Sequence, residues 1–581
     1  MNYFSAGLLI AAALAILPNA PGARAYYVST GGDDSNPGTR ERPWRSIEKI
    51  NAMRFAPGDS ILFHAGDRFP GNLVLDERSR TSARRPIAIG SYGPSRATIA
   101  AGTGTAILVK NLGGIVVRDL VVQGAGATRN RGAGIDIRNT GAVALRLEFV
   151  RVESVDASGF RWAGIYIGGP SRSSAAPGAV TQSGFRGVRI AHCAAHHNLY
   201  YGILVSGPFD MYPSTYANED VTVSDSVVHH NSGDPFYTEN HSGSGILVEN
   251  TDGGVIERCV AYENGGSNGG LTGGPVGIWA HNADRIVIQS CISYRNRTKG
   301  SADGGGFDFD GGVSNSIMQY NLSFENDGPG YLVWNYPYAP RPLQHIVIRY
   351  NISSGDARRH TYGGIHIGGD GQPLRDIAVY HNTVAANPAC RGARAAWVGG
   401  PPHERIRFWN NLLLTSGAAL LVEISPGQND VVFQGNAYWA QPGPFAVLDH
   451  GRTFASLDRW RASTGQEMSD GRARGMDADV SAPSPEAAGW YRPRPGSPLI
   501  DAAMDIHALF GVNTGGRDVW GTTVPQGRGR DIGAQEYDSH QRAGSGHPPL
   551  LEPVPAWWSA ARIRENESSC NAEVTGKGAG L

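Results

Sequence analysis

The sequence has few cysteines, few lysines and only one long apolar run. Five cysteines stand among 581 residues without a C-x-x-C motif, so a zinc or redox site of that kind has no support. Lysine occurs four times, and the 51 basic residues are otherwise arginine, balanced by 52 acidic residues. No basic patch of the kind that binds nucleic acid stands out. The composition therefore predicts no nucleic-acid partner and no charge steering by the whole protein.

The one apolar run lies at the N-terminus. Residues 7–17 are apolar, and Ala23-Arg24-Ala25 forms an A-x-A cleavage motif. Residues 1–25 are therefore predicted to be a signal peptide, with the mature chain starting at Tyr26. A membrane anchor is the alternative, but the run is too short to span a bilayer. No later segment has 18 uninterrupted apolar residues, which predicts a secreted bacterial protein, extracellular or periplasmic, with no membrane span; we expect a monomer.

A repeat of about thirty residues fills the middle of the chain. Eight segments end in a small or amide residue, spaced 29 to 33 residues apart: Cys193, Ser226, Cys259, Cys291, Asn321, Asn351, Asn382 and Asn411. Five positions further on stands a second series, almost all asparagine: Asn198, Asn231, Asn264, Asn296, Asn326, Asp356 and Asn387. Two fainter copies end at Leu120 and Val150.

Stacked coils explain both series. If each repeat is one turn of a solenoid, equivalent side chains lie about 4.8 Å apart and amides bond to each other along the axis. The leucine spacing of leucine-rich repeats is absent. The sequence therefore predicts an all-β parallel β-helix of about a dozen coils. Cys259 and Cys291 would share a column, where buried free thiols are favoured over a disulfide.

The two ends of the repeat region resemble those of right-handed parallel β-helix families, which include pectate lyases, alginate lyases and several glycoside hydrolases. The opening carries Tyr26-Tyr27-Val28-Ser29, then Pro43-Trp44-Arg45-Ser46-Ile47 and Pro57-Gly58-Asp59-Ser60-Ile61; the end carries Gly496-Ser497-Pro498-Leu499-Ile500-Asp501 and Asp531-Ile532-Gly533-Ala534. The resemblance covers roughly residues 26–537 and implies a right-handed helix. It does not choose a reaction, because this fold hosts many.

These motifs suggest a division of the chain. A short helix at Trp44–Arg54 is expected to plug the N-terminal end of the solenoid, because an open sheet end invites aggregation. A second short helix is expected within 454–463. The predicted parts are a signal peptide (1–25), an N-terminal cap with the first coil (26–86), the β-helix (87–440), C-terminal coils with an exit segment (441–537) and a disordered tail (538–581).

One predicted sheet has an informative outer face. In each coil a Gly is followed by a strand whose first and third residues are apolar, so the second and fourth are expected to face solvent. The second positions are Asp136, Tyr166, Leu204, Leu247, Trp279, Asp308, Leu332 and His366; the fourth are Arg138, Gly168, Ser206, Glu249, His281, Asp310, Trp334 and Gly368. Acids, imidazoles and indoles cluster over four adjacent coils. Such a surface suits a sugar chain, because indoles stack on sugar rings and acids transfer protons.

Asp308 and Asp310 are the candidate catalytic acids. Residues i and i+2 of a strand have Cα atoms about 6.5–7 Å apart on one face, a spacing compatible with the carboxyl pair of a glycosidase. The alternatives are Ca²⁺ ligands, together with Asp303, or plain surface acids. His281 lies one coil earlier in the column of Asp310 and is a candidate proton shuttle or simply a paired charge.

Further residues complete the candidate site. Trp279 and Trp334 flank the acids as platforms for sugar rings, and Glu249, His366 and Asn335 are candidate substrate-binding residues. Lyases of this fold use Lys or Arg as the base, so Lys299, Arg295 and Arg297 are alternatives, although Lys299 is as easily a solvated loop cation.

The sequence thus favours a secreted glycoside hydrolase that cleaves a polysaccharide. A Ca²⁺-dependent lyase acting on a uronate polymer is the first alternative. A non-catalytic carbohydrate-binding protein is the second. Ca²⁺ is the one candidate cofactor, and it belongs to the lyase alternative.

Overall fold

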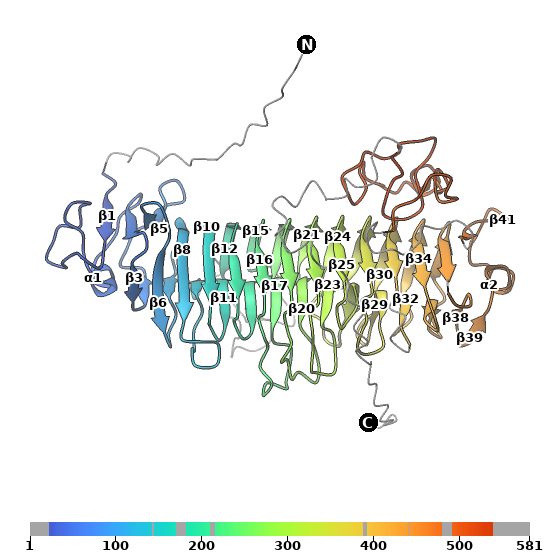
Figure 1. The fold of residues 1–581 in the computed structure, drawn as a ribbon, viewed down its shortest axis with the longest axis horizontal. Helices are drawn as coiled ribbons and strands as arrows, with labels where there is room; N and C mark the ends of the chain where they lie inside the picture. The colour runs from blue at the N-terminus through green and yellow to red at the C-terminus, as the bar shows by residue number, and fades with distance from the viewer. Residues whose placement is uncertain are drawn as a thin grey trace, which may run out of the picture.

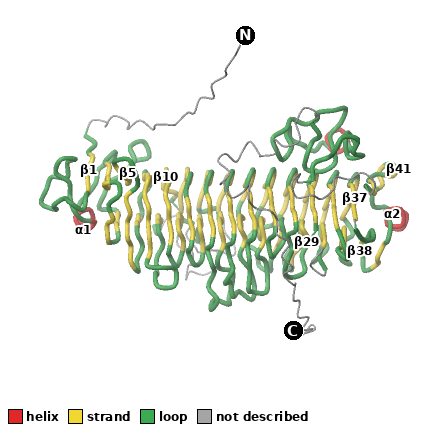
Figure 2. The backbone as a smooth tube through the Cα atoms, viewed as in Figure 1, coloured by secondary structure: helices red, strands yellow, loops and turns green. Residues whose placement is uncertain are grey.

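The structure is a computed structural model that describes residues 22–141, 145–169, 182–208, 215–386, 392–440, 442–478 and 491–538. Short strands stack along one long axis, coil upon coil, with loops on both sides (Figures 1 and 2). All strand pairs between successive coils are parallel except the last, in which β38 pairs antiparallel with β39. The predicted parallel β-helix is therefore confirmed.

One continuous sheet carries the outer face singled out above. Its strands, in chain order, are β4 (Leu73–Leu75), β7 (Ile107–Lys110), β9 (Ile135–Arg138), β11 (Ala163–Gly168), β14 (Tyr201–Ser206), β17 (Ser244–Glu249), β20 (Val276–His281), β23 (Gly305–Asp310), β26 (Tyr331–Asn335), β29 (Gly363–Gly369), β32 (Arg394–Val398), β35 (Leu420–Ile424), β38 (Val447–Asp449) and β39 (Arg452–Phe454). Each strand from β4 to β35 pairs in parallel with the equivalent strand of the next coil, and β39 forms an antiparallel hairpin with β38. We call it the site sheet.

The other walls of the solenoid belong to a second, connected sheet. Its strands are β1 (Ala25–Val28), β2 (Ser60–His64), β3 (Arg68–Pro70), β5 (Ile87–Tyr92), β6 (Ala97–Gly102), β8 (Ile115–Gly124), β10 (Arg146–Ser158), β12 (Gly184–Ala191), β13 (Ala194–His196), β15 (Asn218–Ser224), β16 (Val227–His229), β18 (Thr251–Glu257), β19 (Val260–Tyr262), β21 (Asp284–Gln289), β22 (Ile292–Tyr294), β24 (Ser314–Gln319), β25 (Leu322–Phe324), β27 (Gln344–Arg349), β28 (Ile352–Ser354), β30 (Arg375–Tyr380), β31 (Thr383–Ala385), β33 (Glu404–Trp409), β34 (Leu412–Thr415), β36 (Val431–Gln434), β37 (Ala437–Ala440) and β42 (Met476–Asp477). A small hairpin joins β40 (Met468–Ser469) to β41 (Arg472–Ala473).

The interior is built from the inward residues of every coil. On β23, Phe307 and Phe309 are fully buried, and Phe307 stacks on Tyr331 of β26 with ring centroids 5.2 Å apart. Because strand side chains alternate, this inward pair obliges Asp308 and Asp310 to point outward. The packing of the core therefore fixes the face on which the two acids lie.

Both predicted asparagine ladders are present, although Asn387, the last predicted member of one series, lies outside the described residues. In one, Asn198, Asn231, Asn264 and Asn296 each donate an amide N–H to the side-chain oxygen of the next member at 2.9–3.1 Å, and Asn326 donates to Asp356 at 2.8 Å. The other ladder runs from Asn321 through Asn351, Asn382 and Asn411 to Asn436. In this parallel solenoid, the buried side-chain amides of the ladders are thus hydrogen-bonded to the equivalent side chains of the next coil.

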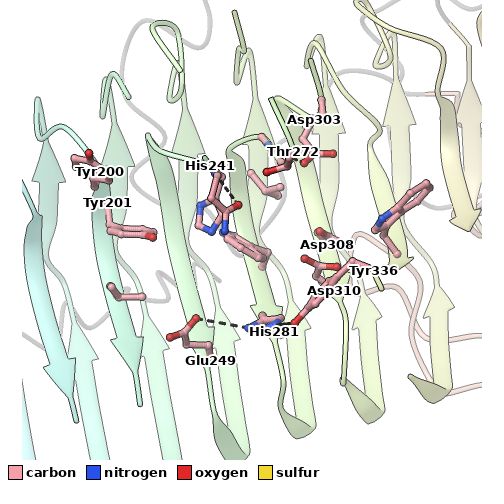
Figure 3. Close-up of a pocket in the computed structure, with 18 of the residues that line it drawn as sticks. Tyr200, Tyr201, His241, Glu249, Thr272, His281, Asp303, Asp308, Asp310 and Tyr336 are labelled. Carbon is pink, nitrogen blue, oxygen red and sulfur yellow. Dashed lines mark hydrogen bonds and ion pairs between the residues drawn. The ribbon is translucent and has the colours of Figure 1, made fainter. Parts of the chain in front are cut away.

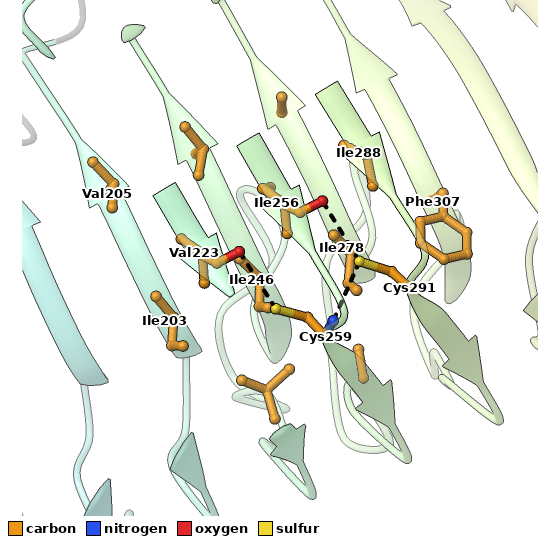
Figure 4. Packing of buried hydrophobic residues seen from close by; sticks show 14 of the residues in the cluster. Ile203, Val205, Val223, Ile246, Ile256, Cys259, Ile278, Ile288, Cys291 and Phe307 are labelled. Carbon is orange, nitrogen blue, oxygen red and sulfur yellow. Dashed lines mark hydrogen bonds between the residues drawn. The ribbon is translucent and has the colours of Figure 1, made fainter. Parts of the chain in front are cut away.

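Three cysteines line the interior as free thiols, as predicted. Cys193, Cys259 and Cys291 are buried and unbridged. Cys259 and Cys291 lie on successive coils, and the backbone N–H of Cys259 donates to Sγ of Cys291 at 3.4 Å (Figure 4). Cys390 and Cys570 lie outside the described residues.

The helices are short. The first predicted helix is α1 (Ile47–Ala52), whose N-cap Ser46 accepts from the backbone N–H of Lys49 and whose Ile47 and Ile50 are buried. The second is α2 (Leu457–Thr464), which begins three residues later than expected. α1 lies at the N-terminal end of the solenoid in Figure 1, and its role as an end cap stays a prediction.

The exit segment is irregular and follows the last strands of the solenoid. Residues 491–538 contain α3 (Ile506–Phe510) and no strand, and they pack against the outside of the solenoid. The side chain of Asn410 donates to the Met504 carbonyl at 2.9 Å, and Arg349 donates to the Asn513 carbonyl at 2.6 Å. Within the described residues no helix is both long and apolar enough to cross a membrane. Residues 1–21 and 539–581, which hold most of the predicted signal peptide and tail, lie outside the described residues.

A buried glutamate ends the second ladder and makes stability depend on pH. Glu467 accepts from the amide of Asn436 at 2.8 Å, and burial raises its pKa from 4.5 to about 7. A raised pKa means that the folded state holds the proton more tightly, so this contribution is complete below pH 4.5 and is lost as pH rises through 7. The free energy of unfolding of the wild type relative to Glu467→Gln should fall by roughly 3 kcal/mol across that range. Denaturant melts at pH 4.5 and 8 measure this difference. The exposed Glu41→Gln variant is the control, and a difference for Glu467→Gln that stays flat with pH contradicts the assignment.

Candidate functional site

A cleft of about 1130 Å³ runs over the outer face of the site sheet. Its floor and walls come from β14, β17, β20, β23 and β26 and from the loops that precede these strands (Figure 3). The lining includes most of the predicted candidates, namely Glu249, Trp279, His281, Asp303, Asp308, Asp310 and Trp334. His366 and Asn335 are not among the described lining residues. The structure therefore gathers seven of the nine predicted site residues in one cleft.

The expected solvent exposure of the second strand positions is wrong. Trp279 is 4% exposed, Asp308 3% and His366 2%. The side chains do point outward, but the loops before each strand fold back over them. His241, from the loop before β17, packs edge-on against Trp279 with centroids 4.9 Å apart. The outer face is a covered floor, so Asp308 cannot be a plain surface acid.

Asp308 and Asp310 differ in their surroundings. Asp308 is buried, its Oδ1 makes no hydrogen bond, and burial together with the charges of Asp310 and Asp303 raises its pKa well above the usual value. Burial also raises the pKa of Asp310, but the charge of His281 and the backbone N–H of Gly311, at 2.7 Å, counter that rise. Two nearby carboxyls with unequal environments are the arrangement that divides acid and base roles. The pKa of Asp308 is therefore raised further than that of Asp310, and Asp310 is the acid that ionises more readily.

His281 belongs to a polar chain beside Asp310. Its Nε2 lies 2.6 Å from the hydroxyl of Tyr336, and its Nδ1 lies 3.6 Å from Oε2 of Glu249 (Figure 3). His281 is paired across the sheet with Asp310, as the register predicts. The imidazole can thus relay a proton between the cleft and Glu249 while favouring a charged Asp310.

Asp303 precedes β23, and two hydrogen bonds hold its carboxyl group in place. Its Oδ1 accepts from the hydroxyl of Tyr362 at 3.1 Å and its Oδ2 from the backbone N–H of Gly274 at 2.9 Å. Burial raises the pKa of Asp303 to about 7. Among the described residues, no group of three or more His, Cys, Asp or Glu side chains is arranged to hold a metal ion. The role of Asp303, Asp308 and Asp310 as Ca²⁺ ligands stays a prediction.

The remaining candidates have structural partners. His366 is enclosed by the rings of Trp334, Tyr362 and Trp397, with centroids 5.7, 5.3 and 4.2 Å away. Asn335 is fully buried and donates to the Gln372 carbonyl at 2.8 Å. Neither side chain reaches the cleft in this arrangement.

The alternative bases also lie elsewhere. Lys299 is exposed and does not line the cleft. Arg295 is paired with Glu325 at 2.7 Å, and Arg297 with Asp327 at 3.2 Å. The arginines that do line the cleft, Arg131 and Arg161, belong to its N-terminal end.

Several lining residues escape the sequence pattern. Three of them contact predicted residues: Tyr336 hydrogen-bonds to His281, Tyr362 hydrogen-bonds to Asp303, and His241 packs against Trp279. An aromatic group at the N-terminal end of the cleft consists of Trp162, Tyr200 and Tyr201. Most stand on loops whose lengths vary between coils, so no fixed repeat phase marks them. The doublet Tyr200-Tyr201, next to the strand of its coil, was the one available signal.

One family model matches the middle of the chain. Residues 133–338 match the family model described as the right handed beta helix region. Among curated proteins nothing matches. A solved GH136 lacto-N-biosidase from Eubacterium ramulus is similar at 17% identity and a TM-score of 0.46, over 74% of this chain and 68% of that chain. Pectate lyase Pel9A is similar at 15% identity and a TM-score of 0.41, over 89% and 96% of the two chains.

A third similar structure is the A-module of a mannuronan C-5 epimerase from Azotobacter vinelandii. It is 14% identical with a TM-score of 0.42, over 74% of this chain and 91% of that chain. Each of the three proteins is named for an activity on a carbohydrate. The match to the family model confirms the predicted right-handed parallel β-helix.

Proposed function

We propose that this protein is a glycoside hydrolase that cleaves a polysaccharide in the cleft over β14–β26. The observation that carries the proposal is the pair of carboxyls on β23, which share the cleft floor but have unequal surroundings. In glycosidases one carboxyl must be protonated and the other ionised at the same pH. Burial of Asp308 and the charge of His281 next to Asp310 support that division.

The chemistry follows from these two states. Asp308 gives its proton to the oxygen of the scissile glycosidic bond, so that the leaving sugar departs as an alcohol. Asp310 either takes a proton from a water molecule whose oxygen bonds to the sugar carbon as the glycosidic bond breaks, or attacks that carbon itself and forms a glycosyl ester. Water then hydrolyses this ester, with the ionised Asp308 as the base. Glu249 lies 3.6 Å from His281 and stabilises a positive charge on the imidazole when the charge of Asp310 changes. The cleft is partly closed by loops, which strengthens these electrostatic effects.

The charge around the acids disfavours a uronate at the point of cleavage. Asp303, Asp308, Asp310, Asp370 and Glu249 all line this part of the cleft, and no described Lys or Arg lines it with them. Elimination from a uronate needs its carboxylate to be neutralised and a base to abstract the adjacent proton. A neutral or amino sugar meets no such repulsion here. The carboxyls therefore favour hydrolysis over lysis.

Stacking by Trp334 should contribute to binding more than to turnover. The ring is half-buried in the cleft wall one coil beyond Asp310. Trp334→Ala should raise KM about 10-fold, since loss of a ring contact costs on the order of 1–2 kcal/mol, with kcat within a few-fold of the wild type. Trp334→Phe should restore most of the affinity. A large fall in kcat with unchanged KM would place Trp334 in the chemistry instead.

A panel of polymers tests the function. The protein is incubated with neutral, amino-sugar and uronate polymers, while new reducing ends and the absorbance near 235 nm are followed. We expect new reducing ends without absorbance. Both signals together mean lysis of a uronate polymer, the first alternative; in that case EDTA should abolish activity and Ca²⁺ restore it. Binding with neither signal means a carbohydrate-binding protein.

We also propose that the protein is exported. Ala25 begins β1 and pairs with Ser60, so the predicted cleavage before Tyr26 falls at the first strand of the fold. N-terminal sequencing of protein from the culture medium or periplasm should start at Tyr26. Intact protein that retains Met1 in the cytoplasm contradicts export.

A further inference from the structure

The cleft extends farther on one side of Asp308 and Asp310 than on the other. Toward the N-terminus its lining continues from β23 through β20, β17 and β14 to Trp162, before β11, and Arg131, before β9. Toward the C-terminus the described lining consists of β26, of Tyr336 and Pro337 just after it, and of Tyr362 and Asp370 from the two ends of β29. Because coils are about 4.8 Å apart, the strands that line the cleft extend about 14 Å on one side of the acids, as far as β14, and about 5 Å on the other, as far as β26.

The short side ends in a wall of packed rings. At β29 the second outward residue, His366, is covered by Trp334, Tyr362 and Trp397. The other outward residue of this strand, at the fourth position after its Gly, is Gly368. A Cβ added there would meet the Gly399 carbonyl at 3.0 Å and the Trp334 ring at 3.1 Å. No described residue of β29, β32 or β35 lines the cleft. A sugar chain that crosses the acids therefore meets this wall after about one coil.

The N-terminal side of the cleft carries aromatic side chains that can bind sugars. Trp162 and Tyr200 are half-buried and line the cleft there with ring centroids 5.6 Å apart, and Trp162 also packs against Tyr201 at 5.3 Å. Aromatic rings along a groove hold successive sugar units by stacking. Most of the binding energy for a polymer is thus available on the N-terminal side of the scissile bond.

From this asymmetry we infer that the enzyme cleaves close to one end of its polymer and releases one or two sugar units at a time. The inference rests on the proposed hydrolysis at Asp308 and Asp310. The retained chain lies over β11–β20, and the terminal units occupy the space between the acids and the wall formed by Trp334, His366 and Trp397. An internal segment of a long chain would have to pass through that wall.

Early products test the inference. Whichever polymer of the panel is cleaved is sampled below a few per cent conversion, with product lengths separated by chromatography and viscosity followed in parallel. We expect one short product length from the first time point, with viscosity nearly unchanged while reducing ends accumulate. A mixture of lengths with an early fall in viscosity overturns the inference and leaves hydrolysis standing. Failure to cleave any polymer removes the proposed function itself, and this inference with it.

A variant tests the wall directly. Trp397 does not line the cleft, and Trp397→Ala removes the ring that covers His366 from the far side. This variant should yield longer and more varied products while keeping turnover within a few-fold of the wild type. Trp409→Ala, which removes a ring packed on Phe510 outside the site, controls for loss of a large side chain. Unchanged product lengths in a folded Trp397→Ala protein would show that the wall does not end the cleft.

Discussion

Asp308→Asn and Asp310→Asn should each lower kcat on the cleaved polymer by at least about 100-fold, since each removes a proton-transfer or nucleophilic group. Asn keeps the shape of Asp and cannot ionise. Because Asp308 is buried without a hydrogen bond to Oδ1, its replacement should leave the melting temperature unchanged or slightly higher. Steady-state kinetics with reducing-end detection, alongside thermal melts, measure both effects.

The control is an acid far from the cleft. Asp220 is exposed and paired with Arg189 at 2.8 Å on the other sheet, so Asp220→Asn should keep wild-type kinetics. If both cleft variants turn over near the wild-type rate on a confirmed substrate, the chemistry lies elsewhere on the solenoid.

Asn264→Leu should destabilise the folded protein by about 3 kcal/mol, because buried groups on both neighbouring coils lose partners at once. Asn264 accepts from the backbone and side-chain N–H groups of Asn231 at 3.2 and 2.9 Å. It donates to the Val228 carbonyl at 3.2 Å and to Asn296 at 3.0 Å. Leucine has a similar size but supplies none of these bonds.

Denaturant unfolding at fixed pH measures the loss for Asn264→Leu. The matched control is Asn429→Leu, since Asn429 is exposed and outside the ladder. We expect the control to change the free energy of unfolding by less than about 0.5 kcal/mol, as is usual for surface sites. Equal effects of the two variants would mean that the ladder contributes nothing specific.

The fold could be predicted because stacking imposes a phase on the sequence. Asn198, Asn231 and Asn264 recur at one position of each coil because only a like neighbour satisfies a buried amide there. Where no amide recurs from coil to coil, the predicted alignment of successive coils is wrong. The copy ending at Val150 was aligned with Leu120, whereas Leu120 pairs with Val155. No amide marks the column at that end of the solenoid.

The candidate site could be predicted only in part. Strand alternation placed Asp308, Asp310 and His281 on one face correctly, because two-residue periodicity leaves no other choice once Phe307 and Phe309 are inside. It could not predict the burial of that face, which depends on loops of irregular length. For the same reason the roles of His366 and Asn335 as packed residues, and of Tyr336 and Tyr362 as supports, were not foreseen.

The division of roles between the two acids is the central claim, and leaving-group dependence tests it most directly. Wild type, Asp308→Asn and Asp310→Asn are assayed on aryl glycosides of the cleaved sugar, with phenol leaving groups of high and low pKa. A good leaving group needs no proton from the enzyme. We predict that Asp308→Asn recovers much of its bond-cleavage rate on the most acidic phenol, while Asp310→Asn stays inactive on all of them. Equal impairment of Asp308→Asn on every leaving group would contradict its role as the acid.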